Sequence, residues 1–209
     1  MKFHSGRGQA EIDRLMYEKY FREPEKIHGT CIECGALDGV NLSICHFFER
    51  YLGWKCINIE ANPDVFKTLC INRPYATNIN RILSAQDYRV LGFACDPKRP
   101  KLSRVSKNSS VQVQTITYRT LIQEQKLTQI DLFVLDVEDH ELEVLEGMKG
   151  AEVLPDYMCI EVKGGGGRSE AKTAQINKAL NEIHPYSLQF CASYNGVWKK
   201  ESTSSLPNK

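Results

Sequence analysis

Six carboxylates follow directly on an apolar run in the middle of the chain, in the stretch IDLFVLDVEDHELEVLEGM at residues 130–148. The six acids are Asp136, Glu138, Asp139, Glu141, Glu143 and Glu146. An acid at the end of a buried strand can attract a cationic ligand or accept a proton, so Asp136 and Glu138 are candidate catalytic residues. The three later glutamates fit an amphipathic helix whose apolar positions, Leu142, Leu145 and Met148, face the sheet. Acids in the first turn favour a helix N-terminus, so these three are interpreted as capping or solvated.

A histidine stands directly after Asp139, the third of these acids. Its ordinary pKa of about 6.5 suits a general base, so His140 is a third candidate catalytic residue. Its alternative role is to cap or decorate the helix. Asp136 and Glu138 could also hold Mg²⁺ and so lower the pKa of a bound hydroxyl. Two ligands fall short of the octahedral shell that Mg²⁺ demands, so no residue is assigned as a metal ligand.

A glycine turn follows the apolar run at residues 29–35. The turn reads Gly35, Ala36, Leu37, Asp38 and Gly39. Both glycines let the backbone approach a ligand, and a helix that begins near Asn41 offers free N–H groups. The next apolar run ends in Glu60, where doubly wound folds place the carboxylate that binds ribose hydroxyls. Turn and acid together predict a ligand that contains adenosine.

The charges around this turn distinguish two adenosine ligands. An NAD-dependent oxidoreductase would use G-x-G-x-x-G and a helix end that binds pyrophosphate. Here the glycine spacing differs, and Glu33 and Asp38 add negative charge that repels phosphates but favours a sulfonium and an amino group. We therefore predict S-adenosylmethionine as the cofactor in preference to NAD.

The strands and helices that would position these residues alternate along the chain. Residues 29–35, 55–60 and 130–136 are predicted to be parallel strands that are apolar on both faces, with helices at 41–52 and 62–73. The other predicted elements are strands at 78–83 and 157–162, helices at 140–149 and 169–184, two extra strands around an exposed loop within 90–115, and an antiparallel hairpin turning at Asn195-Gly196. This order is typical of an α/β, Rossmann-like doubly wound sheet, mostly parallel with an antiparallel C-terminal hairpin.

Length and charge limit the functions open to the chain. Its 209 residues suit one domain, followed by a disordered tail at 202–209. Lys plus Arg (27) nearly cancels Asp plus Glu (26), which excludes a general nucleic-acid binder and an anionic membrane partner. Without a signal-peptide core or a run of roughly 20 apolar residues, a cytoplasmic location is predicted. The eight cysteines are predicted to be reduced core residues, including the Cys31-x-x-Cys34 pair.

Several stretches resemble, in the right order, the motifs of FkbM-type S-adenosylmethionine-dependent methyltransferases. These stretches are SGRGQAEID, CIECGALDGVNLS, LGWKCINIEANPDVFKTLCINRP and IDLFVLDVEDHELEVLEGM, between about Ser5 and Lys163. The resemblance implies a class I methyltransferase fold with a seven-stranded sheet and an antiparallel last strand. It also implies O-methylation of a hydroxyl on a sugar, a glycan or another natural product.

The same resemblance implies roles for individual residues. Glu33, Gly35, Ala36 and Gly39 would line the methionine part of the cofactor, Glu60 its ribose, and Asn62 and Ser84 the neighbourhood of its adenine. Ser5, Gln9 and Asp13 match an N-terminal segment, residues 1–28, that would fold over the cofactor site of the domain at 29–201; their alternative role is an ordinary helix cap and solvated face.

One position departs from the family pattern, because Asp139 stands where the family has glycine. An acid there could narrow the acceptor pocket, bind a cation or reflect lost activity. The main alternative function is therefore a non-catalytic module that keeps the cofactor fold for binding or scaffolding.

The acceptor is the least defined partner. A small-molecule or glycan acceptor is expected, and neither its identity nor the oligomeric state follows from the sequence, with which a homodimer is compatible. Four glycines, 164–167, could form a mobile lid over the acceptor or a simple flexible loop. Glu161, Lys163 and Arg168 could contact the acceptor or be solvated loop charges.

Overall fold

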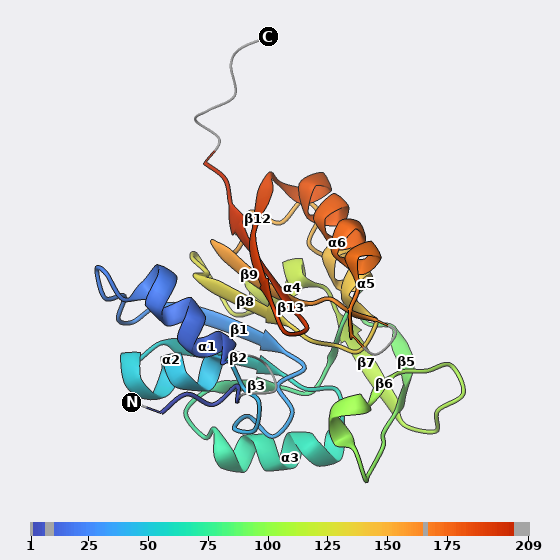
Figure 1. Ribbon diagram of the computed structural model, residues 1–209. Coiled ribbons are helices and arrows are strands. Elements are labelled where there is room, and N and C mark those ends of the chain that lie inside the picture. Colours follow the sequence, from blue (N-terminus) through green and yellow to red (C-terminus); the bar gives the residue numbers. More distant parts are fainter. Residues whose placement is uncertain (1, 7–10, 165–166, 203–209) are drawn as a thin grey trace.

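The computed structural model describes residues 2–6, 11–164 and 167–202, and its centre is a seven-stranded sheet in the order β12-β13-β9-β8-β1-β2-β3 (Figure 1). The strands are β1 (Thr30–Cys34), β2 (Lys55–Ile59), β3 (Thr77–Ile79), β8 (Leu132–Leu135), β9 (Tyr157–Glu161), β12 (Tyr186–Ala192) and β13 (Asn195–Lys200). β13 is antiparallel to both of its neighbours, and the other pairings are parallel. The predicted α/β class and doubly wound, mostly parallel sheet are therefore confirmed.

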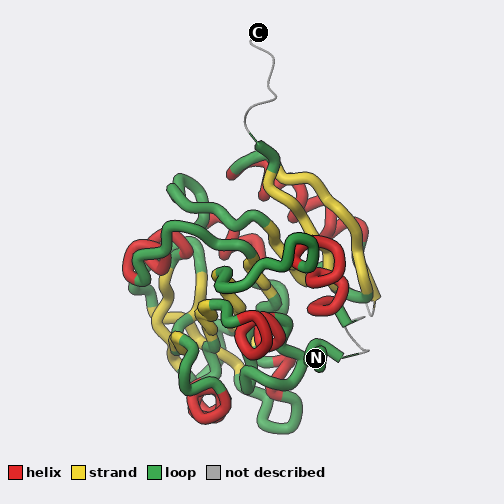
Figure 2. The backbone as a smooth tube through the Cα atoms, turned by 90° about the vertical axis from the view of Figure 1, so that its left-hand side faces the viewer, coloured by secondary structure: helices red, strands yellow, loops and turns green. Residues whose placement is uncertain are grey.

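Helices cover both faces of this sheet. They are α1 (Ile12–Met16), a π-helical turn η2 (Tyr17–Phe21), α2 (Cys45–Leu52), α3 (Pro63–Asn72), α4 (Tyr118–Glu124), α5 (Glu141–Glu146) and α6 (Glu170–Ile183). The buried residues of α1 and α2 pack on one face and those of α4, α5 and α6 on the other; in Figure 1, α3 lies at the bottom of the view and α6 at the upper right. Figure 2 shows the two long strands of the C-terminal hairpin along one margin of the molecule, where β12 forms the sheet edge.

The strands are apolar on both faces because each face packs against helices. In β1, Cys31 joins the core formed with α1 and α2, whereas Ile32 and Cys34 join the core formed with α4, α5 and α6. Each fully buried aliphatic side chain of this kind contributes roughly 1.5–3 kcal/mol. Cys31 and Cys34 lie in different cores, so the C-x-x-C spacing does not form a two-cysteine site, and both thiols are free and buried.

A second, small sheet follows β3 in the chain. Its order is β4-β7-β5-β6, and its strands are β4 (Ile82–Leu83), β5 (Val90–Ala94), β6 (Arg104–Val105) and β7 (Gln112–Ile116), with a 3-10 turn η3 (Pro100–Leu102). The predicted strand at 78–83 is wrong as one element, because the chain breaks at Asn80 and Arg81 into strands of two different sheets. Asn80 fixes this break, since its side-chain amide donates to the carbonyls of Glu60 and Ala61.

Two other predicted boundaries are wrong, and one helix was missed. The helix predicted from residue 41 begins at Cys45, because the Asp38 carboxylate accepts the N–H groups of Val40 and Asn41 and holds a turn there. The hairpin turns at residues 193–194, with Asn195 and Gly196 already in β13. A Cβ on Gly196 would lie 2.5 Å from the Trp198 ring, so packing rather than turn geometry demands that glycine. Helix α4 was not predicted.

The N-terminal segment packs on α2. Ser5 Oγ donates to Asp13 Oδ1 (2.5 Å), and both residues are fully buried. Ile12, Met16 and the aromatic side chains of η2 fill the core on this side of the sheet. Predicted residue Gln9 lies outside the described residues, as do positions 165–166 of the glycine run and residues 203–209 of the tail. No helix in the described part of the chain is long and apolar enough to span a bilayer.

Candidate active site

A hollow opens beyond the carboxyl ends of β1, β2 and β8. Its empty volume is about 880 Å³, including the part open to solvent. Strand order reverses between β1 and β8, and doubly wound folds bind their ligands at such a reversal. Among the lining residues are Gly35, Ala36, Glu60, Asp136, Glu138 and His140. With Glu33, which also lines it, the hollow brings together seven of the site residues singled out in the sequence.

The glycine turn is shaped by two close approaches. Gly35 has φ +85° and is exposed to the hollow, and a Cβ there would lie 1.8 Å from the carbonyl oxygen of Asp136. Gly39 has φ +78°, and a Cβ there would meet the side chains of Leu69 and Arg73 at 2.5 and 2.7 Å. Gly35 thus lets β1 and β8 close up beneath the hollow, whereas Gly39 lets the turn pack on α3.

Glu33 lines the hollow, but its carboxylate is used by the protein itself. Oε1 accepts the N–H groups of Ile44 (2.7 Å) and Cys45 (3.3 Å), and Oε2 accepts Ser43 Oγ (2.5 Å). Burial raises the pKa of Glu33, while the Arg73 guanidinium and these hydrogen bonds oppose the rise. The helix N-terminus that was expected to offer free N–H groups is therefore already satisfied by a buried acid.

Three further predicted cofactor residues do not line this hollow. Asp38 holds its turn, and Asn62 caps α3 by accepting the N–H groups of Asp64 and Val65; both line a more open hollow beside the first. Ser84 lies next to the candidate base instead, with its Oγ 3.0 Å from His140 Nε2.

Glu60 stands at one end of the hollow, after β2. Its carboxylate accepts the N–H groups of Leu37 (2.9 Å) and Asn62 (2.7 Å), and it has little exposed surface. Burial raises the pKa of Glu60 to about 7, against the lowering effect of these backbone hydrogen bonds. A buried carboxylate with spare acceptor capacity is suited to hydroxyl donors.

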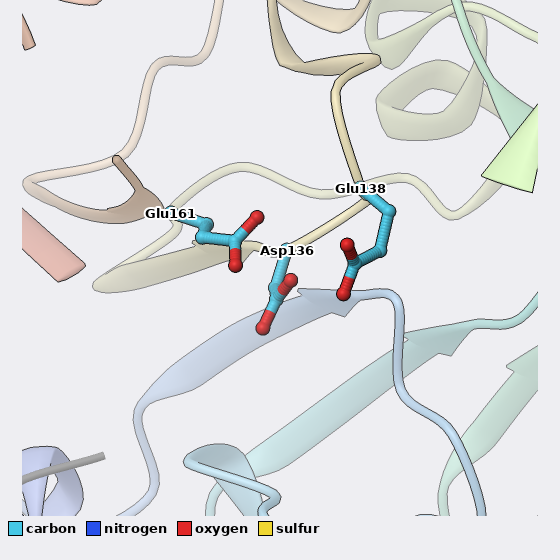
Figure 3. Close-up of side chains that lie close together, drawn as sticks. All are labelled: Asp136, Glu138 and Glu161. Atoms are coloured by element: carbon cyan, nitrogen blue, oxygen red, sulfur yellow. The ribbon is translucent and has the colours of Figure 1, made fainter. Parts of the chain in front are cut away.

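Three carboxylates converge at the other end, beyond β8 and β9. Oxygen atoms of Asp136, Glu138 and Glu161 lie within 4.8 Å of one another, and Figure 3 shows Glu138 and Glu161 on either side of Asp136. Burial and then repulsion between the acids raise the pKa of Asp136 to about 7 and that of Glu161 to about 8. Burial also raises the pKa of Glu138, against the pull of Lys163. Carboxyl groups with pKa values near neutrality can exchange protons at physiological pH.

The cations near these acids come from the chain. Lys172 Nζ lies 3.0 Å from Glu141 Oε2, 3.2 Å from Asp139 Oδ1 and 3.8 Å from Glu161 Oε2, and Lys163 Nζ lies 4.0 Å from Glu138 Oε2. These ammonium groups already balance part of the negative charge. We assign no metal ligand here.

Two predictions about the helix α5 are wrong. Glu141 is not a solvated helix acid: only 2% of its side chain is exposed, and Oε1 accepts the Val137 N–H while Oε2 pairs with Lys172. Leu142 does not face the sheet, since it is 42% exposed, and Val144 takes the buried position beside Leu145 and Met148.

His140 lines the hollow as predicted. Besides its contact with Ser84, its Nδ1 lies 3.7 Å from Glu143 Oε2. Burial lowers the pKa of His140, opposed by Glu143 and Glu141, so the imidazole is neutral at physiological pH. Asp139 does not line the hollow; it has φ +75°, its side chain is 76% exposed, and it reaches outward to Lys172.

Sequence reasoning gave Glu161 no firm role and missed Glu141 and Lys172. Glu161 ends its strand as Asp136 does, a signal that could have identified it. Lys172 and Glu141 are 31 residues apart, and only the packing of α6 on α5 reveals their pairing.

A family model described as the methyltransferase FkbM domain matches residues 33–185. The matched range is most of the chain and includes both ends of the hollow. The chain belongs to this family.

One curated relative is similar to the chain over much of its length. Hexuronic acid methyltransferase AglP of Haloferax volcanii is 26% identical over 164 residues, which are 76% of this chain and 64% of that protein. The chain therefore spans less than two thirds of this relative.

Solved structures are similar in fold. The methyltransferase FkbM of Methylobacillus flagellatus matches with a TM-score of 0.55 and 17% identity, covering 86% of this chain and 46% of that one. A TehB-like SAM-dependent methyltransferase of Corynebacterium glutamicum matches with a TM-score of 0.51 and 12% identity, covering 93% of this chain and 88% of that one. The doubly wound fold is thus that of S-adenosylmethionine-dependent methyltransferases.

The residues of the hollow fit such a cofactor. Glu60 offers a buried acceptor for ribose hydroxyls, and the side chains of Ile82 and Phe93 form an apolar wall at that end of the hollow. Gly35 leaves room where a side chain would intrude, and Asp136 and Glu138 give the other end the negative charge that a sulfonium and an amino group require.

Proposed function

We propose that the protein is an S-adenosylmethionine-dependent methyltransferase that transfers a methyl group to a hydroxyl of a sugar or glycan. The observation that supports this proposal is a single hollow with acids at both ends. Glu60 lies buried at one end, where it could accept hydroxyl groups, and Asp136 and Glu138 lie at the other, where they could exchange protons. Membership of the FkbM family supports the methyl transfer, and the activity named for AglP, on a hexuronic acid, supports the sugar acceptor.

Different residues of the hollow would bind different parts of the cofactor. Glu60 would accept the ribose hydroxyls, the apolar wall at Ile82 and Phe93 would hold the adenine, and the turn at Gly35 and Ala36 would leave space for the methionine part. S-adenosylmethionine supplies a methyl group on a positively charged sulfur. The task of the protein is then to align the acceptor hydroxyl with that methyl group and to remove its proton.

The chemical step balances with the residues present. The acceptor oxygen forms the new bond to the methyl carbon, the electron pair of the carbon–sulfur bond stays on sulfur, and the hydroxyl proton passes to Asp136 or Glu138. Their raised pKa values, about 7 for Asp136, match a base that works near neutrality. His140, neutral and bonded to Ser84, orients the acceptor or serves as a second base.

Calorimetry tests the cofactor. S-adenosylmethionine and S-adenosylhomocysteine should bind, and NAD should not. Glu60→Gln should weaken binding by about 10- to 150-fold, because a hydrogen bond to a charged group is worth about 1.5–3 kcal/mol. Glu146→Gln, at an exposed glutamate of α5 that pairs with Lys149, is the matched control and should leave the affinity unchanged. Tight binding of NAD would refute the proposal.

Transfer of a labelled methyl group tests the reaction. Glycans with and without uronic acid should be offered beside amine acceptors, and product analysis should place the label on oxygen. Label on nitrogen would refute the hydroxyl acceptor while leaving a methyltransferase. Cofactor binding with no transfer to any acceptor would instead favour the non-catalytic binding module.

A further inference from the structure

Lys172 sits in the first turn of α6, where Ser169 caps the helix by accepting the Lys172 N–H (3.1 Å). Only 15% of its side chain is exposed, and its ammonium reaches Glu141 and Asp139 within hydrogen-bond distance and Glu161 at 3.8 Å. One cation therefore joins α6, α5, the turn after β8 and the end of β9.

Glu161 lies beside Asp136, on the side opposite Glu138. It is 6% exposed, it does not line the hollow, and its carboxylate faces Asp136 and Glu138 (Figure 3). Among the described residues its ion-pair partner is Lys172. Glu161 thus stands between the acids that reach the hollow and the cation that does not.

The surroundings of these acids are strongly negative. The charged or titratable groups that face them are Asp136, Glu138, Asp139, His140, Glu141, Glu143, Glu161, Lys163 and Lys172, with the buried thiols Cys34 and Cys159 beneath. Among the described residues, Lys163 pairs with Glu138 and Lys172 pairs with Glu161, and both lysines lower the pKa of Asp136. Removing a cation must therefore change how readily these acids ionise.

We propose that Lys172 and Glu161 are positioning residues for the base: Lys172 holds Glu161 beside Asp136, and the charge of Lys172 sets the pH at which Asp136 and Glu138 can accept the proton of the acceptor hydroxyl. The catalytic part of this inference rests on the proposed function. The electrostatic part concerns the protein alone and is measurable without an acceptor.

The two positioning residues should affect different titration steps. Lys172→Met removes a cation that lowers the pKa of Asp136, so that pKa should rise. Glu161, whose pKa is raised to about 8, is still protonated when Asp136 loses its proton, so Glu161→Gln should remove the upper titration step and change the Asp136 midpoint little. The shift in Lys172→Met should be about one pH unit, at the low end of the roughly 1–3 units that a nearby charge produces.

Carbon-13 titration of side-chain carboxyls tests this in the ligand-free protein. The Asp136 signal is assigned by its loss in Asp136→Asn. Its midpoint should move up in Lys172→Met and little in Lys172→Arg, which keeps the charge. Glu161→Gln should remove the upper titration step, near pH 8, and leave the Asp136 midpoint nearly unchanged. Lys178→Met and Glu170→Gln change exposed residues of the same helix and should move nothing. Equal Asp136 midpoints in wild type and Lys172→Met would overturn the proposal.

The pH profile of methyl transfer gives the functional reading. The acidic limb should move to higher pH in Lys172→Met, with Lys172→Arg and Glu161→Gln close to wild type. A role in stability alone would lower the rate at every pH without moving the limb, and that result would refute the positioning role.

Failure of the proposed function can be told apart from failure of this inference. If the variants shift the titration but the wild-type protein neither binds S-adenosylmethionine nor transfers methyl, the proposed function is contradicted and the electrostatic part is still supported. Melting temperatures of all variants identify any that fail to fold.

Discussion

The two ends of the hollow raise carboxyl pKa values by different physical causes. At the β2 end, Glu60 is a single acid whose pKa of about 7 comes from burial, with backbone N–H groups as its donors. At the β8 end, Asp136 reaches about the same value because burial is joined by repulsion from Glu138 and Glu141. A lone buried acid is satisfied by hydroxyl donors, whereas crowded acids exchange protons with one another. We infer that one end holds the ligand and the other carries the chemistry.

The variants with the largest expected effect neutralise one acid at each end of the hollow. Asp136→Asn should reduce methyl transfer roughly 10²–10⁴-fold, the usual contribution of a general base. Glu60→Gln, assayed at saturating S-adenosylmethionine, should keep most of the wild-type rate, because its defect lies in binding. Single-turnover rates measure both.

Asp156→Asn supplies the control, since this acid pairs with Lys200 away from the hollow. Equal losses of rate in the Asp136 and Glu60 variants at saturating cofactor would remove the distinction between the two ends.

A second test changes the residue at which the two ends meet. Gly35→Ala should destabilise the protein by about 3 kcal/mol, because the new Cβ would overlap the Asp136 carbonyl in a left-handed backbone conformation. It should also move Asp136 relative to the turn and so weaken both binding and transfer. Urea unfolding measures the stability.

Gly167→Ala is the matched control, because a Cβ there meets nothing within 4 Å. A Gly35→Ala protein as stable as the control would show that β1 and β8 separate easily at this point.

The residues at the carboxyl ends of the buried strands were the easiest to predict. The apolar runs before Gly35, Glu60 and Asp136 are strands because both faces are buried, and such strands need no knowledge of partners. Their carboxyl ends meet at one edge of the sheet, so the sequence predicted this part of the hollow correctly.

Residues that depend on distant packing were not predictable in the same way. Helix propensity and charge made Glu141 look solvated, yet α6 buries it against Lys172. Asn195-Gly196 has the composition of a hairpin turn, but Gly196 is required by the Trp198 ring, and the turn falls two residues earlier. In both cases a tertiary contact outweighs a local pattern.

A third, smaller effect should appear in the pH dependence of stability. The pKa values of Glu60, Asp136 and Glu161 are raised to about 7, 7 and 8 in the folded protein. Groups with raised pKa values stabilise the fold fully below their unfolded values, near 4, and this contribution is lost as pH rises through 7–8. The ligand-free protein should therefore lose stability between pH 5 and 8, on the order of 2 kcal/mol for Glu60 alone.

Melting curves at several pH values separate the two ends. Glu60→Gln should remove its share of the fall at the β2 end, whereas Glu161→Gln should remove the part of the fall near pH 8 at the other end. A melting temperature that rises from pH 5 to 8 would contradict the raised pKa values at both ends.

The smallest expected effect is at Asp139, the acid that departs from the family pattern. Asp139→Gly should change the free energy of unfolding by less than about 1 kcal/mol. Glycine relieves the strain of the positive φ, which stabilises the protein. Two losses offset this gain: glycine is freer in the unfolded chain, and the exposed ion pair with Lys172 is lost. Methyl transfer should be retained, since Asp139 points away from the hollow and leaves Lys172 its contacts with Glu141 and Glu161. Urea unfolding and transfer rates, with Asp139→Asn as the variant that keeps the backbone strain but not the charge, separate these contributions. A rate more than tenfold above wild type in Asp139→Gly alone would mean that backbone strain in the turn holds Glu138 away from its working position, and the proton-accepting end of the hollow would then have to be redrawn.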